Sequence, residues 1–183
     1  MTQPKGYLHL QKQYEALPPT LQKYFQYLPS LLADYPYEVA LSYLFARLER
    51  GHNMVLYCGA VKLHRADASI MADVIQKQHL TRETFRKLFD AVFGKKIDKN
   101  ILTSLEAAES VRDRAIHGKE PTDADMRKAI SDVLVYAGDF NAFVRGFAGF
   151  EPFGDLRGFK GRAAPLSKST TRWLLKGLGF DVS

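Results

Sequence analysis

Apolar side chains recur every three or four residues along most of this chain, and the alternation typical of strands is almost absent. The clearest stretch follows Pro121, where the apolar positions are Met126, Ile130, Val133, Ala137, Phe140, Val144 and Phe147. This spacing places one apolar stripe along a helix, and the stripe must be buried against another element. We therefore expect an all-α fold built as a helical bundle.

Polar cap residues and glycines predict where the helices begin and end. We expect a long helix from Tyr37, in which Gly51 or Gly59 marks a bend or a close contact between helices. The further expected helices are 67–76 (separate or continuous with the first), 82–93 after Thr81, 99–117 after Asp98, one after Thr122 or Asp123, and 170–176 after Ser167 or Ser169.

The ends of the chain are predicted to lie outside the bundle. Residues 1–36 read as an N-terminal helical extension, with Thr20 as an N-cap and with Pro29 and Pro36 separating short helices. Residues 37–150 form the expected bundle, and 151–183 a basic appendage with a short helix. We expect the appendage to dock on the bundle through Trp173; draping over RNA and binding a partner protein are the alternatives.

The cysteine content, hydropathy and net charge of the chain limit the classes of protein to which it can belong. The single cysteine, Cys58, excludes an intrachain disulfide, and the Cys and His residues have no zinc-like spacing. No signal-type segment and no membrane-spanning run is seen, so we expect a cytoplasmic protein without a membrane partner. A net charge of +6 modestly favours a polyanionic partner such as nucleic acid.

One segment, Arg112-Asp113-Arg114-Ala115-Ile116-His117, combines residues that suggest chemistry. Helical geometry centres Arg112 on an apolar stripe, which is costly unless the guanidinium finds an anion or extends to solvent. The stripe consists of Ile101, Leu105, Ala108 and Ala115, with Ile116 at its edge.

His117 follows at the predicted end of the same helix. Asp113 precedes it by four residues and can reach and orient its imidazole. On an unbroken helix Arg112 and His117 diverge by about 140°. They can therefore cooperate only if the chain swings out at Gly118, or if two copies of the chain meet.

The segment resembles the motif of HEPN domains, in which an Arg, often followed by a polar residue, precedes a His by a short spacing. Here four residues separate Arg112 from His117, a glycine follows, and an amphipathic helix comes next. The resemblance covers roughly residues 37–147. It implies an up-and-down four-helix bundle, usually a homodimer, in which two copies of the motif meet.

Many proteins of this family resemble metal-independent endoribonucleases of toxin or antiviral-defence type. The resemblance then implies that His117 is the general acid/base, Arg112 binds the scissile phosphate, and Asp113 orients the histidine. Arg114 and Lys119 are candidate RNA-binding residues. The implied products are 2′,3′-cyclic phosphate and 5′-hydroxyl ends. The implied partners are an RNA substrate, a second copy and an antitoxin or other regulatory protein, with no cofactor or metal.

Two other functions stay open. The chain can be a non-catalytic HEPN-like module that binds protein or RNA through the same surface. It can also be a helical adaptor unrelated to the family, in which Arg112 merely extends to solvent. One departure from the family weakens the pairing with a nucleotidyltransferase antitoxin, because Lys119 stands where a modifiable Tyr is often found.

Overall fold

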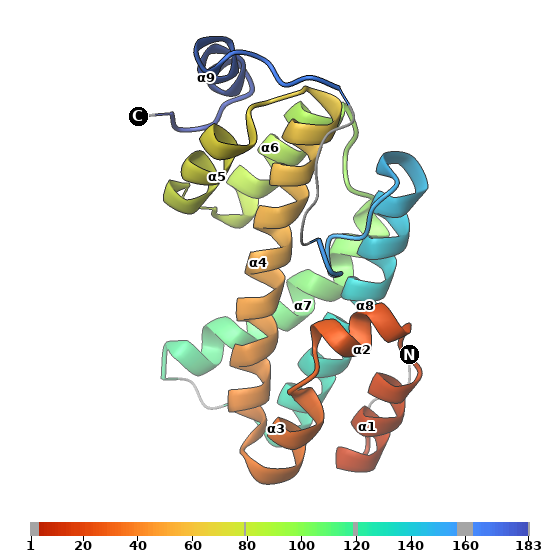
Figure 1. Ribbon diagram of the computed structural model, residues 1–183. Coiled ribbons are helices and arrows are strands. Elements are labelled where there is room, and N and C mark those ends of the chain that lie inside the picture. The colour runs from red at the N-terminus through yellow and green to blue at the C-terminus, as the bar shows by residue number, and fades with distance from the viewer. Residues whose placement is uncertain (1–3, 79, 119–120, 157–162, 183) are drawn as a thin grey trace. The chain divides into compact units, whose positions relative to one another are not determined.

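The computed structural model describes residues 4–78, 80–118, 121–156 and 163–182. Over this part of the chain the regular structure is entirely helical, as predicted (Figure 1). The helices are α1 (Tyr7–Glu15), α2 (Pro19–Tyr24), α3 (Leu28–Asp34), α4 (Tyr37–Leu63), α5 (Ala68–Lys77), α6 (Arg82–Phe93), α7 (Lys99–Ile116), α8 (Asp123–Ala148) and α9 (Lys168–Gly177).

The helices belong to two compact units, each built from two separate stretches of sequence. The first unit comprises Met1–Arg50 and Asp98–Asp155, and the second comprises Gly51–Ile97 and Leu156–Ser183. Helix α4 contributes its first half to one unit and its second half to the other. These units cut across the segments 1–36, 37–150 and 151–183, whose role as domains stays a prediction.

The first unit has an aromatic core. Helix α7 packs against α8, and α1 contacts both α8 and α3. Five rings from α2 and the residue after it, from α8 and from the segment after α8 contact one another, with neighbouring centroids 5.2 to 6.4 Å apart. They belong to Tyr24, Phe25, Tyr136, Phe140 and Phe153, all buried. Offset and edge-on contacts of this kind add to the stabilisation from burial.

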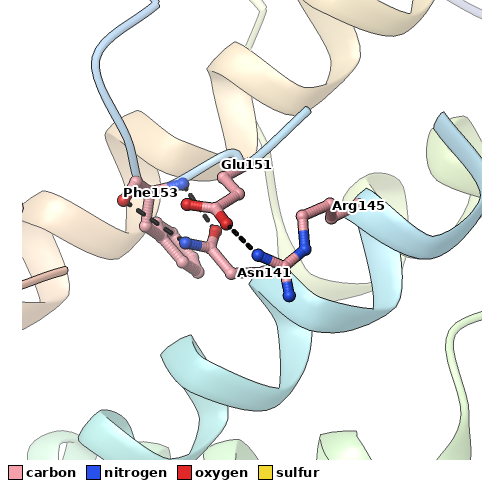
Figure 2. Close-up of polar contacts among 4 residues, drawn as sticks. All are labelled: Asn141, Arg145, Glu151 and Phe153. Carbon is pink, nitrogen blue, oxygen red and sulfur yellow. Dashed lines mark hydrogen bonds and ion pairs between the residues drawn. The ribbon is translucent and has the colours of Figure 1, made fainter. Parts of the chain in front are cut away.

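A short segment after α8 completes this core (Figure 2). The backbone N–H of Phe153 donates to Asn141 Oδ1 at 2.8 Å, and Asn141 Nδ2 donates to the Phe153 carbonyl at 3.4 Å. On the surface, Arg145 pairs with Glu151 at 2.9 Å. Phe153 is therefore held against α8 by its backbone as well as by its ring.

The second unit has a close contact between α4 and α6. A Cβ added at Gly59 would lie 2.6 Å from Val92 Cγ1 and also against the Phe93 ring. Gly59 thus marks a close helix contact, one of the two roles expected for it. Nearby, the His52 ring stacks on Phe85 with centroids 4.1 Å apart. Cys58 is buried in this unit, and burial raises its thiol pKa to about 12.

Helix α9 docks in the second unit and contacts α5 (Figure 1). Thr171 and Leu175 are fully buried, and Thr171 Oγ1 accepts a hydrogen bond from the Asp67 backbone at 3.0 Å. The expectation that Trp173 mediates the docking was wrong, because 77% of Trp173 is exposed. The helical period explains this: Thr171 and Leu175 lie one turn apart on one face, and Trp173 lies on the other.

The N-terminal region departs from expectation in three places. Helix α1 was not predicted, since Leu10 is its one buried residue. Thr20 is not an N-cap, because α2 already begins at Pro19, whose ring presets a helical φ. Pro29 lies in the first turn of α3, where its missing N–H costs nothing, rather than between helices.

Three of the other caps are where the sequence predicts them: the side chains of Thr81, Thr122 and Ser167 each accept a backbone N–H of the first helical turn. Asp67, expected as the first residue of its helix, is instead the N-cap of α5 and accepts the N–H groups of Ser69 and Ile70. Asp98 precedes α7 but makes no capping hydrogen bond with its side chain. In the described part of the chain, every helix is too short or too polar to cross a membrane.

Candidate functional site at the end of helix α7

The packed face of α7 carries two charged residues. Its buried residues are Ile101, Leu105, Ala108 and Glu109, and Arg112 continues the same row, half-buried. The Arg112 guanidinium lies over the buried Phe45 ring of α4, with Cζ 4.9 Å from the ring centroid. A cation over an aromatic face is attracted by the ring electrons, which accounts for an arginine on this row.

Two residues near Arg112, one on α4 and one on α7, were not expected from the sequence. Phe45 was missed as the partner of Arg112, because periodicity identifies a face of a helix but not what covers it. Glu109 is only 7% exposed, three residues before Arg112. Oppositely charged residues at this spacing are neighbours on a helix, and that signal was available in the sequence.

His117 lies at the C-terminal end of α7 and is exposed. Its backbone N–H donates to the Asp113 carbonyl at 3.1 Å, so the last turn stays helical up to this residue. The chain leaves the helix at Gly118, whose φ of 73° favours glycine. The imidazole therefore projects where the helix ends.

Asp113 is half-buried one turn before His117. The hydrogen bond described above joins the backbone N–H of His117 to the backbone carbonyl of Asp113 and does not involve either side chain. Orientation of the imidazole by the Asp113 carboxylate stays a prediction.

Arg114 contacts the start of the next helix. Its Nη2 lies 3.6 Å from Asp125 Oδ2, and both side chains are more than a third exposed. Asp125 is also part of the capping box with Thr122 that begins α8. Arg114 thus has a protein partner at the surface, while Lys119 lies outside the described residues.

The structure does not bring Arg112 and His117 together within one chain. Because α7 continues unbroken to Ile116, the two side chains leave the helix axis about 140° apart. Within the described residues no hydrogen bond or ring contact joins them. Of the two arrangements considered from the sequence, a swing of the chain at Gly118 comes too late to redirect His117. A shared site therefore needs a second copy.

The surface around His117 includes an apolar group. Ile116, expected at the edge of the stripe, is 62% exposed.

Two histidines of the second unit have structural partners. His64 Nε2 contacts the Val92 carbonyl at 2.6 Å, and the His52 ring is stacked on Phe85. The described residues contain no group of three His, Cys, Asp or Glu side chains that could hold a metal ion.

Comparison of the chain with models of protein families, with curated proteins and with solved structures finds no match.

Proposed function

We propose that the chain is a metal-independent endoribonuclease of HEPN type that acts as a homodimer in toxin or antiviral-defence systems. The observation that carries this proposal is the pair of groups on α7. A half-buried Arg112 is held over Phe45, and an exposed His117 projects from the end of the same helix. A fixed guanidinium and an accessible imidazole are the groups that phosphodiester transfer needs.

The proposed reaction uses the 2′-hydroxyl of the RNA as its nucleophile. His117 takes the proton of this hydroxyl as its oxygen forms a bond to the adjacent phosphorus. The bond from phosphorus to the 5′ oxygen breaks, and His117 returns the proton to that oxygen. Arg112 binds the non-bridging oxygens, where negative charge accumulates. The products are a 2′,3′-cyclic phosphate and a 5′-hydroxyl, and the internal nucleophile makes a metal unnecessary.

The proposed dimer follows from the direction of the two side chains. Since Arg112 and His117 diverge on one helix, a C2 pair of α7 helices would place Arg112 of one copy beside His117 of the other. The exposed Ile116 supplies an apolar contact for such an interface. An antitoxin or other regulatory protein would block the site by covering Ile116 and His117.

The test compares single variants on RNA in the presence of EDTA. Arg112→Ala and His117→Ala should each lower cleavage by at least about a hundredfold, because each removes a group that acts in the transition state. Arg47→Ala is a matched control, since Arg47 lies over the Tyr24 ring at 4.0 Å and has no role in the proposed site. His9→Ala controls for loss of an exposed histidine.

The product ends and the folded state are measured alongside. Wild-type products should carry 2′,3′-cyclic phosphates, and all variants should keep the helical circular dichroism of the wild type. Cleavage that persists unchanged in both site variants would remove the proposal.

A second candidate is a non-catalytic HEPN-like module that binds protein or RNA through the same surface. The exposure of Ile116 favours it, because an apolar side chain at the end of α7 fits an interface whether or not catalysis occurs. A wild-type protein that forms dimers but cleaves no RNA would select this candidate.

A further inference from the structure

Helix α9 presents a basic face with one large aromatic side chain. Its inward face consists of the buried Thr171 and Leu175, with Leu174 half-buried. At about 100° per residue Lys168, Arg172 and Lys176 form a row that starts at the edge of the buried face, beside Leu175, and turns outward by about 40° per step. Trp173 lies about 60° beyond Lys176, on the side away from the buried face. All four side chains are exposed, and the helix sequence KSTTRWLLKG contains no acidic residue.

This face is held in place within the second unit. Thr171 is bonded to the Asp67 backbone, and Ser167 caps the helix by accepting the Thr170 N–H at 3.1 Å. Beyond the helix, the Asp181 N–H donates to Gln78 Oε1 at 2.9 Å. The exposed side chains therefore project from a fixed helix, which lowers the entropy lost when a ligand binds.

One carboxylate, that of Asp67, lies within electrostatic range of Lys168. Hydrogen bonds from Ser69 and Ile70 lower the pKa of the Asp67 carboxyl, and the Lys168 cation adds a smaller effect in the same direction. Arg172 and Lys176 have no ion pair among the described residues. A phosphate backbone is the complement of such a row of cations.

Trp173 distinguishes between two polyanionic partners. A helix that binds a membrane buries its apolar face in the lipid. In α9 the leucines face the protein, and Trp173 is the one large hydrophobic side chain of this helix that is prominently exposed, at 77%. A single exposed indole beside cations instead matches the platforms on which bases of single strands stack.

We propose that Lys168, Arg172, Lys176 and Trp173 form a binding surface for single-stranded nucleic acid. The cations contact successive phosphates, and one base stacks on the indole. The surface lies in the second unit and is independent of Arg112 and His117. If the chain cleaves RNA as proposed above, this surface binds the substrate strand.

Trp173 is the only tryptophan of the chain, so it reports directly on its own occupancy. The full-length protein is titrated with a 2′-O-methyl oligouridylate, which lacks the nucleophile and cannot be cleaved by the proposed reaction. Stacking should quench the tryptophan fluorescence. Neutralisation of about three phosphates predicts a slope near −2 for log affinity against log salt.

Variants then assign the surface, with affinity measured by anisotropy of a labelled oligonucleotide. Trp173→Ala should weaken binding at least about fivefold, the lower end for loss of one stacked base. Arg172→Ala with Lys176→Ala should reduce the salt slope by about 1.4. A matched double variant, Arg50→Ala with Lys96→Ala, removes two exposed cations elsewhere and should leave binding near the wild-type value.

The controls separate the outcomes. The titration uses an oligonucleotide that cannot be cleaved and reads occupancy of Trp173 alone, so failure of the nuclease proposal leaves this result intact. An equal affinity for oligothymidylate would extend the surface to DNA. The proposal is overturned if the oligonucleotide does not quench Trp173, or if the α9 variants bind it normally. It is also overturned if phosphatidylserine vesicles, but no oligonucleotide, shift the Trp173 emission.

Discussion

One amide side chain, that of Asn141, holds the segment after α8 through both of its polar atoms (Figure 2). Asn141→Ala would leave the buried N–H and carbonyl of Phe153 without these partners. An unsatisfied buried group costs about 1–3 kcal/mol, so we expect a loss of that size in the free energy of unfolding, measured in urea.

The neighbouring pair supplies the control for this experiment. Arg145→Ala removes the contact with Glu151 a few residues away, but the Arg145 side chain is 65% exposed. An exposed ion pair contributes less than about 1 kcal/mol. Equal losses in the two variants would contradict the role assigned to Asn141.

His52 makes the stability of the protein dependent on pH. Burial lowers its pKa to about 3, whereas an unfolded histidine titrates near 6.5. The unfolded state therefore binds a proton that the folded state does not. Stability from this group is complete above about pH 6.5 and is lost progressively as the pH falls from there towards 3.

The corresponding variant is His52→Phe, which keeps an aromatic ring on Phe85 but cannot be protonated. Between pH 7 and pH 5 the wild type should lose about 2 kcal/mol more unfolding free energy than this variant. Urea unfolding at the two pH values gives the difference. Parallel losses would show that His52 is protonated in the folded protein at pH 5.

At the scale of elements, the helices with strong apolar stripes were predictable. Local rules apply there: Thr81 caps α6 and Gly94 ends it, as the sequence indicates. Helix α1 was not predictable, because its position depends on contacts across the sequence. One example is the bond from Gln13 Nε2 to the Ser131 carbonyl, between residues 118 apart. No local pattern encodes such a contact.

The contact between α4 and α6 allows a test at this scale. Alanine is the better helix former by about 1 kcal/mol, yet Gly59→Ala would push a methyl group into Val92 and Phe93. Overpacking of this kind costs about 1–3 kcal/mol, so we expect a net loss of stability by thermal unfolding.

Gly146→Ala in α8 is the matched control. Nothing lies within 4 Å of a Cβ at this exposed position, so helix propensity alone should act. We expect a gain of about 0.5–1 kcal/mol. A gain at both glycines would mean that α6 yields to the added methyl.

For the whole molecule, the sequence places Arg112 and His117 on α7 but does not say whether they meet. Periodicity identified Arg112 as a cation on a packed face, and Gly118 as the exit from the helix. It could not identify Phe45, which contacts Arg112 from α4 and precedes it by more than sixty residues in the sequence. The proposed site depends in addition on a second chain, which no pattern within one sequence encodes.

A mixture of two inactive variants tests that dependence. In a dimer of Arg112→Ala with His117→Ala, one composite site lacks both groups, while the other keeps an intact Arg112 and an intact His117. When the two variants are present in equal amounts and exchange subunits freely, half of the dimers are mixed. Each mixed dimer has one intact site, whereas a wild-type dimer has two. Cleavage should therefore return to roughly a quarter of the wild-type rate.

Mixing two samples of the same variant is the control and should restore no cleavage. If the mixed sample is dimeric and still inactive, although the wild type cleaves RNA, each site must form within one chain. The 140° divergence along α7 would then have to be removed by unwinding its last turn, which measurement of amide exchange at His117 and Gly118 would detect.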